Sequence, residues 1–191
     1  MSIFLWNARP VDRLAAGVEK RIRRGELGLL PSYEKCFFCG RDSKGLKLRI
    51  EYAEGVCSCD FVVDDAFQGF HGVLHGGIVS GILDDVMWWT VFMETGTICV
   101  TWKMDVEFRK TVSCETAYRA VGKYRGITHG NYKVFGGIED DSGKVCASAN
   151  AVFREAKDVK KDDFLRSLDF SGESGEVESL LRSRLLKTER E

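Results

Sequence analysis

One stretch of the chain carries most of the information about its fold: HGGIVSGILDDVMWW, residues 75–89. From residue 78 to residue 93 apolar residues occur on every side of the predicted helix, whereas a helix that faces water has an apolar stripe and a polar face. We therefore predict a long helix that the rest of the protein encloses. Burial of a carboxylate is costly unless it is paired or hydrogen-bonded, so the two acids in this helix, Asp84 and Asp85, indicate a functional site.

Asp84 is the better candidate because of the residues that share its face of the helix. Consecutive residues lie about 100° apart on a helix, so the two acids face different ways. Asp84 is in register with Gly77 and Gly81, whose small size leaves room for another molecule. The first N–H groups of a helix lack intrahelical acceptors and form its positive end. We therefore expect an oxyanion-binding amide near Gly76 and Gly77, and a carboxylate two turns later, to face one cleft.

The remaining pattern predicts strands around this helix. Apolar and polar residues alternate over residues 46–52, 56–63, 97–110, 114–123, 131–139 and 145–154. The sequence Asp140-Asp141-Ser142-Gly143 is typical of a tight hairpin turn between the last two strands. One buried helix followed by an antiparallel meander predicts an α+β domain, with the sheet wrapped around the helix.

An amphipathic pattern precedes this domain. Residues 9–29 have apolar residues at helical spacing, basic residues on the other side, and Pro31 just after them to end the helix. We favour a helix that covers an edge of the domain over one that binds a membrane surface or a partner protein.

The chain becomes strongly charged after residue 154. A short helix is expected over residues 164–170, and a terminal helix over residues 177–185. The predicted organisation is an N-terminal helical extension (1–35), a central domain (36–154) and a charged helical C-terminal tail (155–191).

Composition and charge argue against several classes of function. The chain has 191 residues and a formal net charge of -1, whereas nucleic-acid binding needs a clear basic excess. No apolar run reaches the roughly 18–20 residues that a bilayer-spanning helix requires, and no secretion signal is recognisable. Seven cysteines without an export signal fit reduced thiols, so we predict a cytoplasmic protein.

The central stretch resembles the hotdog-fold thioesterases, specifically the phenylacetate-degradation (PaaI-like) branch. In that pattern a His-Gly-Gly triplet is followed by six small or apolar residues and an acid, and His75-Gly76-Gly77 with Asp84 matches it without a gap. Other segments resemble the family's glycine-rich loop, the strand after its helix, its closing hairpin and an N-terminal motif of some members, namely residues 67–74, 100–109, 141–153 and 36–48. The likeness covers most of residues 36–154 and implies the hotdog fold, an antiparallel sheet around one long central helix.

The resemblance implies an acyl-CoA thioesterase, which hydrolyses acyl-CoA to a free acid and CoA. Asp84 corresponds to the acid that acts as nucleophile or general base, and the amide of Gly77 to the donor that holds the thioester oxygen. His75 matches a residue that shapes the site, and Thr101 matches a Ser or Thr that the partner subunit contributes. The resemblance also implies a homodimer or a dimer of dimers, with no cofactor other than the CoA of the substrate.

The expected substrate contacts match the family less closely. Many members orient the thioester or the water with an Asn at the position of Gly69, so the neighbouring Gln68 is the candidate for that task. Three basic residues at predicted strand ends are candidates for binding the phosphates of CoA: Arg109, Lys123 and Arg125.

Two other functions stay open at this point. A hotdog hydratase or dehydratase would use His75 with a carboxylate, and a non-catalytic protein would bind or sense acyl-CoA, because a fold alone does not define a function. The acyl group is also open. Trp88, Trp89, Phe92 and Trp102 form either a bulky apolar pocket or part of the core.

A metal site is a further alternative that we do not favour. Cys36 and Cys39, together with Cys57 and Cys59, offer the paired thiols of a zinc site, but only one residue separates the second pair. Alternation along the predicted strand puts both members of that pair on one face, which favours buried small hydrophobic residues. We therefore predict no metal ligand.

Overall fold

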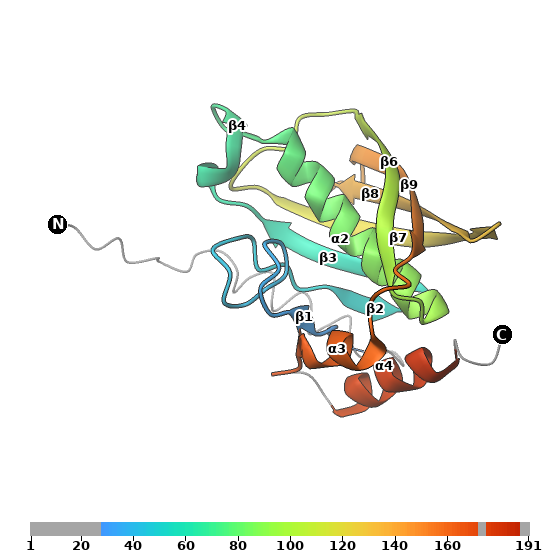
Figure 1. Ribbon diagram of the computed structural model, residues 1–191. Helices are drawn as coiled ribbons and strands as arrows, with labels where there is room; N and C mark the ends of the chain where they lie inside the picture. Colours follow the sequence, from blue (N-terminus) through green and yellow to red (C-terminus); the bar gives the residue numbers. More distant parts are fainter. Residues whose placement is uncertain (1–27, 172–174, 188–191) are drawn as a thin grey trace.

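The computed structural model describes residues 28–171 and 175–187 of the chain (Figure 1). Residues 9–27 of the predicted N-terminal helix lie outside the described residues. In the described part, a long helix, α2 (Gly76–Thr95), lies against a large curved sheet, and two shorter helices follow near the C-terminal end.

The remaining elements, in chain order, are short near the N-terminus and longer in the sheet. They are β1 (Ser32–Tyr33), β2 (Glu51–Ala53), β3 (Val56–Val62), the 3-10 helix η1 (Asp65–Phe67), β4 (Gln68–Phe70), β5 (Val73–Leu74), β6 (Cys99–Phe108), β7 (Ala117–Thr128), β8 (Asn131–Glu139), β9 (Val145–Glu155), α3 (Lys161–Arg166), β10 (Leu168–Asp169) and α4 (Gly175–Lys187).

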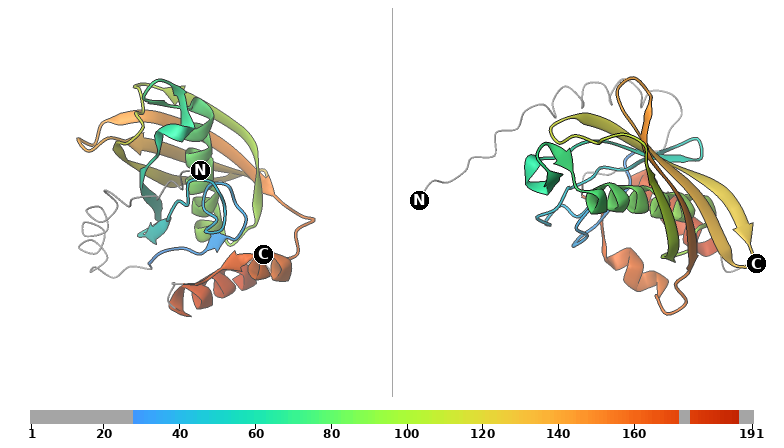
Figure 2. Two further views of the ribbon diagram at one scale, coloured as in Figure 1. Left: turned by 90° about the vertical axis from the view of Figure 1, so that its left-hand side faces the viewer. Right: turned by 90° about the horizontal axis from the view of Figure 1, so that it is seen from above.

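The main sheet is antiparallel and has its strands in the order β2-β3-β7-β8-β9-β6. Strands β7, β8 and β9 form its centre, and β2 and β6 are its two edges. Seen from above, this sheet curls around α2 (Figure 2). The structure therefore confirms the predicted α+β architecture, in which an antiparallel sheet wraps around one central helix.

Two glycines allow α2 to lie close to the sheet. Gly122 on β7 and Gly136 on β8 are opposite each other in the ladder. A Cβ atom at Gly122 would lie 2.2 Å from Oγ1 of Thr90, and one at Gly136 would lie 3.0 Å from Met87, both on α2. The helix can therefore approach the sheet backbone at this point only because neither residue has a side chain.

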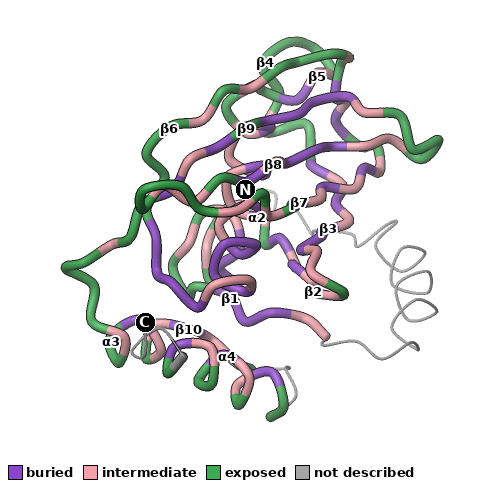
Figure 3. The backbone as a smooth tube through the Cα atoms, turned by 90° about the vertical axis from the view of Figure 1, so that its right-hand side faces the viewer, coloured by how far each residue is buried: buried purple, intermediate pink, exposed green. Residues whose placement is uncertain are grey.

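The core lies between α2 and the concave face of the sheet. Side chains of α2 such as Leu83, Val86 and Met87 are fully buried there. Strands β8 and β9 are largely buried along their middle parts, whereas β6 is mostly exposed (Figure 3). The helix ends at Gly96, whose positive φ of 72° is a left-handed conformation that glycine adopts without strain.

The predicted strand over residues 46–52 is largely wrong. Only β2 (Glu51–Ala53) joins the sheet, and the preceding residues pair with a loop instead. The N–H of Leu46 donates to the carbonyl of Phe37, and the N–H of Leu48 donates to that of Phe38. The alternation in this segment therefore reflects one-sided burial on a loop, which a strand pattern cannot distinguish from burial in a sheet.

The C-terminal tail packs onto the domain. Strand β10 pairs with β1, so the two ends of the described chain form a small sheet of their own. The predicted terminal helix is confirmed as α4, which buries Val177, Leu181 and Leu185. The short helix predicted over residues 164–170 is only partly correct, because α3 covers Lys161–Arg166 and residues 168–169 form β10 instead. Phe164 of α3 joins the core.

Two further expectations concern membrane helices and thiols. No helix in the part of the chain that the structure describes is long and apolar enough to cross a membrane. All seven cysteines are free thiols, as predicted.

The glycine pair makes a testable prediction about stability. Gly122→Ala should lower the free energy of unfolding by about 1–3 kcal/mol, because the new Cβ would overpack the contact with Thr90. Gly137→Ala is the matched control, since its Cβ would meet Phe135 and Val121 at an ordinary 3.7 Å. Chemical denaturation of both variants measures the difference, and equal stability would contradict this account of the helix position.

Candidate active site

The start of α2 is capped by His75. Its Nδ1 accepts the N–H of Gly77 at 2.9 Å, and its carbonyl oxygen accepts the N–H groups of Ile78 and Val79. The N–H of Gly76 has no hydrogen-bond acceptor within residues 28–171 and 175–187. The first turn of α2 contains no acidic residue, so the positive charge at this end of the helix is not neutralised from within the turn.

This cap changes the expected role of Gly77. The resemblance assigns the oxyanion-binding amide to Gly77, but in this conformation that N–H donates to the imidazole of His75. Gly77 could bind an oxyanion only after His75 rotates away. The open donor at the helix start is the N–H of the preceding residue, Gly76.

Asp84 lies two turns further along α2, beside the edge strand β6. The hydroxyl of Thr101 on β6 donates to Oδ1 of Asp84 at 2.7 Å. Burial raises the pKa of the Asp84 carboxyl, and the hydrogen bond from Thr101 opposes that rise. The structure thus brings these two predicted residues together within one chain, whereas the resemblance implies a Thr from the partner subunit.

The edge strand beside Asp84 exposes large apolar side chains. Val100, Trp102 and Phe108 on β6 are 55%, 56% and 56% exposed. The guanidinium of Arg154 lies 3.5 Å from the centre of the Trp102 ring. An edge strand with unpaired backbone groups and large apolar side chains is suited to pairing with another chain.

Gln68 does not contact Asp84 in the described structure. Its Oε1 accepts the N–H of Gly72 at 3.0 Å, within its own loop. The neighbouring Gly69 lies against His75, because a Cβ atom at Gly69 would be 3.2 Å from Cα of His75. The position that many family members fill with Asn is therefore next to the helix start, while the Gln68 side chain is turned toward Gly72.

The three candidate CoA-binding residues are separate from Asp84 within one chain. Arg109 forms an exposed ion pair with Glu107 at 2.7 Å. The guanidinium of Arg125 lies 5.4 Å from the ring centre of Phe135. Lys123 follows Gly122, which faces α2, so Lys123 lies on the opposite face of the sheet. No contact among the described residues joins any of the three to Asp84, and their role stays a prediction.

The aromatic residues of α2 belong to the core rather than to an open acyl pocket. The ring of Trp88 stacks on that of Phe92, with 5.7 Å between the ring centres, and the ring of Phe164 of α3 packs against both. Trp89 is buried, and Nε1 of Trp88 donates to the carbonyl of Cys99 at 2.7 Å. Of the four aromatic candidates, Trp102 alone is exposed.

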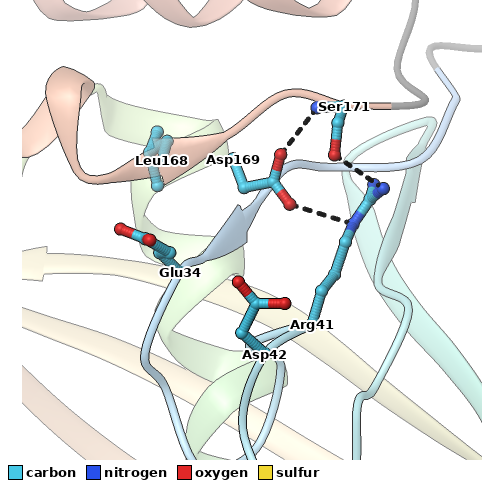
Figure 4. Close-up of a pocket in the computed structure, with 6 residues that line it drawn as sticks. All are labelled: Glu34, Arg41, Asp42, Leu168, Asp169 and Ser171. Atoms are coloured by element: carbon cyan, nitrogen blue, oxygen red, sulfur yellow. Dashed lines mark hydrogen bonds and ion pairs between the residues drawn. The ribbon is translucent and has the colours of Figure 1, made fainter.

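A surface pocket of about 440 Å³ lies away from this site (Figure 4). It lies between the loop around residues 34–42 and the segment that follows α3. Arg41 crosses it, with an ion pair to Asp169 at 3.3 Å and a hydrogen bond to Ser171 at 3.0 Å. None of the predicted catalytic residues lines it.

Asp85 lies among different neighbours from Asp84. Burial raises the pKa of its carboxyl to about 8. The thiol of Cys39 lies 3.9 Å from Oδ1 of Asp85, and the buried Oδ2 has no hydrogen-bond partner within residues 28–171 and 175–187. Sequence reasoning missed this contact because 46 positions separate the two residues and no local pattern links them.

The four cysteines weighed as a zinc site do not come together. Cys36 and Cys39 lie beside Asp85, and the only group of three possible metal ligands in the described residues consists of these. Cys57 and Cys59 are buried in β3, as predicted for small hydrophobic residues.

Comparison with known proteins supports the fold. No family profile matches the chain, and no curated protein is similar enough in sequence to match it. Among solved structures, a phenylacetic acid degradation-related protein from Ralstonia eutropha is 26% identical, with a TM-score of 0.51 over 57% of this chain and 85% of that one. A thioesterase superfamily protein is 16% identical, with a TM-score of 0.60 over 76% of this chain and 75% of that one. A Streptococcus mutans protein bound to acetyl-CoA is 16% identical, with a TM-score of 0.53 over 57% of this chain and 88% of that one.

The topology and these neighbours define the fold of the protein. The chain has the hotdog fold, which it shares with the thioesterase neighbours. The similarity to the Ralstonia eutropha protein supports the PaaI-like assignment that the His-Gly-Gly motif and Asp84 indicated.

The cap formed by His75 can be tested by stability. His75→Ala should lower the free energy of unfolding by about 1 kcal/mol, because the N–H of Gly77 loses its acceptor. His75→Asn supplies another capping acceptor and should restore most of that loss. If thermal or chemical unfolding gives equal values for all three proteins, the cap contributes nothing and His75 is free to turn toward a substrate.

Proposed function

We propose that this protein is an acyl-CoA thioesterase that works as a homodimer, with Asp84 as general base or nucleophile. The observation that supports this proposal most strongly is the partly buried carboxylate of Asp84, which is held by one hydroxyl at an exposed sheet edge. The acetyl-CoA bound to the Streptococcus mutans neighbour supports CoA thioesters as the substrate class.

The spacing along α2 supports a site shared between two subunits. Asp84 is eight residues after Gly76, which corresponds to about 12 Å at 1.5 Å per residue. An oxyanion donor and a base that act on one carbonyl must both lie within about 3 Å of the reacting atoms. The two groups of one helix are too far apart for this, so we assign them to one site from different chains.

A second copy is expected to pair along β6. The unpaired backbone groups of this edge would then find partners, the exposed side chains beside it would be partly covered, and the sheet would continue into the second copy. Antiparallel pairing of the two β6 strands sets the two-fold axis perpendicular to the strands. The two copies of α2 that lie along them are then roughly antiparallel as well, so the start of each helix faces the later turns of the other. This arrangement places the Gly76 amide of one subunit opposite Asp84 of its partner.

The chemistry needs no cofactor beyond the CoA of the substrate. The thioester oxygen accepts the N–H of Gly76 at the positive end of the helix, which stabilises the negative charge of the tetrahedral intermediate. Asp84 either takes a proton from the water that attacks the carbonyl carbon or attacks it directly to form an anhydride that water then hydrolyses. In both routes the C–S bond breaks and CoA leaves as a thiolate, which needs no strong acid.

Asp84→Asn should remove nearly all turnover. The expected loss is about 10²–10⁴-fold, because the amide cannot act as base or nucleophile. Free thiol release from a panel of aromatic and medium-chain acyl-CoA substrates measures it for wild type and variant together. Unfolding curves serve as the control for an intact fold, and unchanged turnover would remove Asp84 from the mechanism.

The same panel, extended by an enoyl-CoA whose hydration is followed separately, distinguishes the alternative functions. If wild type releases no thiol but acyl-CoA raises its thermal stability, the protein is an acyl-CoA-binding protein. If it adds water to an enoyl-CoA instead, it is a hydratase. The cytoplasmic location predicted from the cysteines needs its own measurement, by fractionation of the source cells.

Gly76→Pro tests the oxyanion donor with little disturbance of the helix. Proline is favoured at the first helical position, and the extended conformation of His75 (φ -60°, ψ 133°) suits a residue before proline. The change removes only the open N–H, and kcat should fall about 10²–10³-fold. Gly76→Ala keeps the N–H and adds the same Cβ, which meets Phe108 at 3.4 Å, so it should keep most of its activity.

Co-expression of Gly76→Pro with Asp84→Asn then tests the shared site. A mixed dimer has one site with both changes and one site with neither. Activity should therefore return to about a quarter of wild type in a statistical mixture of dimers. No recovery would mean that each site uses both groups from one chain.

A further inference from the structure

We propose that Cys36, Cys39 and Asp85 form a binding site for one divalent transition-metal ion, with zinc as the expected occupant. The three residues come from the loop before β2 and from the middle of α2. The proposal does not depend on thioesterase activity, because none of the three belongs to the proposed catalytic site.

The distances among the three ligand atoms fit a metal ion. The two sulfur atoms and one carboxylate oxygen of Asp85 all lie within 4.8 Å of one another. The Sγ atom of Cys39 is 3.9 Å from Oδ1 of Asp85. Tetrahedral zinc, with bonds of about 2.3 Å to sulfur and 2.0 Å to oxygen, separates its ligand atoms by about 3.5–3.8 Å. A contraction of the cluster by less than about 1.5 Å therefore completes the geometry.

The loop is shaped to hold a thiolate at Cys36. The N–H groups of Phe38 and Cys39 point at Sγ of Cys36, at 3.3 Å and 3.5 Å. The N–H of Gly40 closes the turn onto the carbonyl of Cys36 at 2.9 Å. A Cβ atom at Gly40 would lie 2.5 Å from that carbonyl oxygen, so the turn requires glycine. Backbone donors around a ligand sulfur orient it and favour the charged form that binds metals.

Asp85 has a carboxylate oxygen that a cation would satisfy. Its Oδ2 is buried and has no hydrogen-bond partner among the residues that the structure describes. A buried acceptor without a partner destabilises the folded state, and more so when it is charged. Its neighbours are the two thiols, which can become anionic ligands but cannot neutralise it. A disulfide between Cys36 and Cys39 would leave this oxygen unsatisfied, whereas a metal ion would bind both thiolates and the carboxylate.

Packing holds the loop against α2 without help from the metal. The ring of Phe38 rests on Gly81, where a Cβ atom would lie 1.9 Å from the ring. On the other side, Arg41 ties the loop to Asp169 and Ser171 (Figure 4). The three ligands are thus held in place by contacts on both sides, which reduces the entropy lost on metal binding.

A metal ion bound by these residues would fasten the loop to α2 one residue away from Asp84. Three protein ligands leave the fourth tetrahedral position to water. The ion would stabilise the fold and fix the turn of α2 that carries Asp84.

The first experiment measures zinc on the untagged full-length protein. Elemental analysis after dialysis against zinc should give about one zinc per chain. Cobalt(II), used as a spectroscopic substitute, should give the charge-transfer absorption of a thiolate ligand. The readouts are metal content and absorption, so they do not require enzyme activity.

Variants then assign the ligands. Cys36→Ser, Cys39→Ser and Asp85→Asn should each lower zinc affinity by about tenfold or more and weaken or remove the cobalt absorption. Asp84→Asn and Cys114→Ser are the matched controls, one a neighbouring acid and one a distant thiol, and should bind zinc as wild type does. The contrast between Asp84→Asn and Asp85→Asn separates this proposal from the proposed function, since the first should lose hydrolysis and keep zinc.

Three results would overturn the proposal. Wild-type protein that binds no zinc and gives no cobalt absorption has no site. Equal zinc binding by Cys36→Ser and wild type places the ion elsewhere. A Cys36–Cys39 disulfide that re-forms in the presence of zinc shows that the pair serves as a redox couple instead.

Discussion

The close approach of α2 to the sheet at Gly122 and Gly136 is the constraint on which the rest of the structure depends. Because the helix lies so near the backbone of β7 and β8, the apolar side chains on its sheet-facing side fill the concave face of the sheet. Asp84 and Asp85 lie on other sides of the same helix, where β6 and the loop of Cys36 and Cys39 partly bury them. The position that the two glycines give the helix therefore decides which elements the two acids can meet.

Those two acids show how adjacent residues on an enclosed helix acquire different chemistry. Asp84 meets a hydroxyl at the exposed edge of the sheet, and Asp85 meets thiols under a loop on another side. Consecutive residues point about 100° apart around the helix axis, so the two side chains face different elements. The two adjacent carboxylates thus belong to two different sites in space.

The sequence allowed the architecture to be predicted because local pattern and final environment agree there. The run from residue 78 to residue 93 is apolar all round and is enclosed, and the strand expected over 131–139 is β8 without a shift. Asp84 could be singled out by its face of the helix. The rest depends on contacts between distant segments: the capping of the Gly77 amide by His75, the pairing of residues 46–48 with the cysteine loop, and the place of Asp85 beside Cys39. Periodicity reports which side of a segment is buried, not what buries it.

The position of Phe164 has a consequence for the order in which the protein folds. This ring covers Trp88 and Phe92 of α2, and β10 pairs with β1 at the other end of the described chain. A nascent chain that has reached β9 can form the sheet and the helix but still exposes these aromatic rings to water. This apolar surface is closed only after α3 leaves the ribosome, because contacts between distant segments form late. Synthesis of the tail is therefore the step that completes the core.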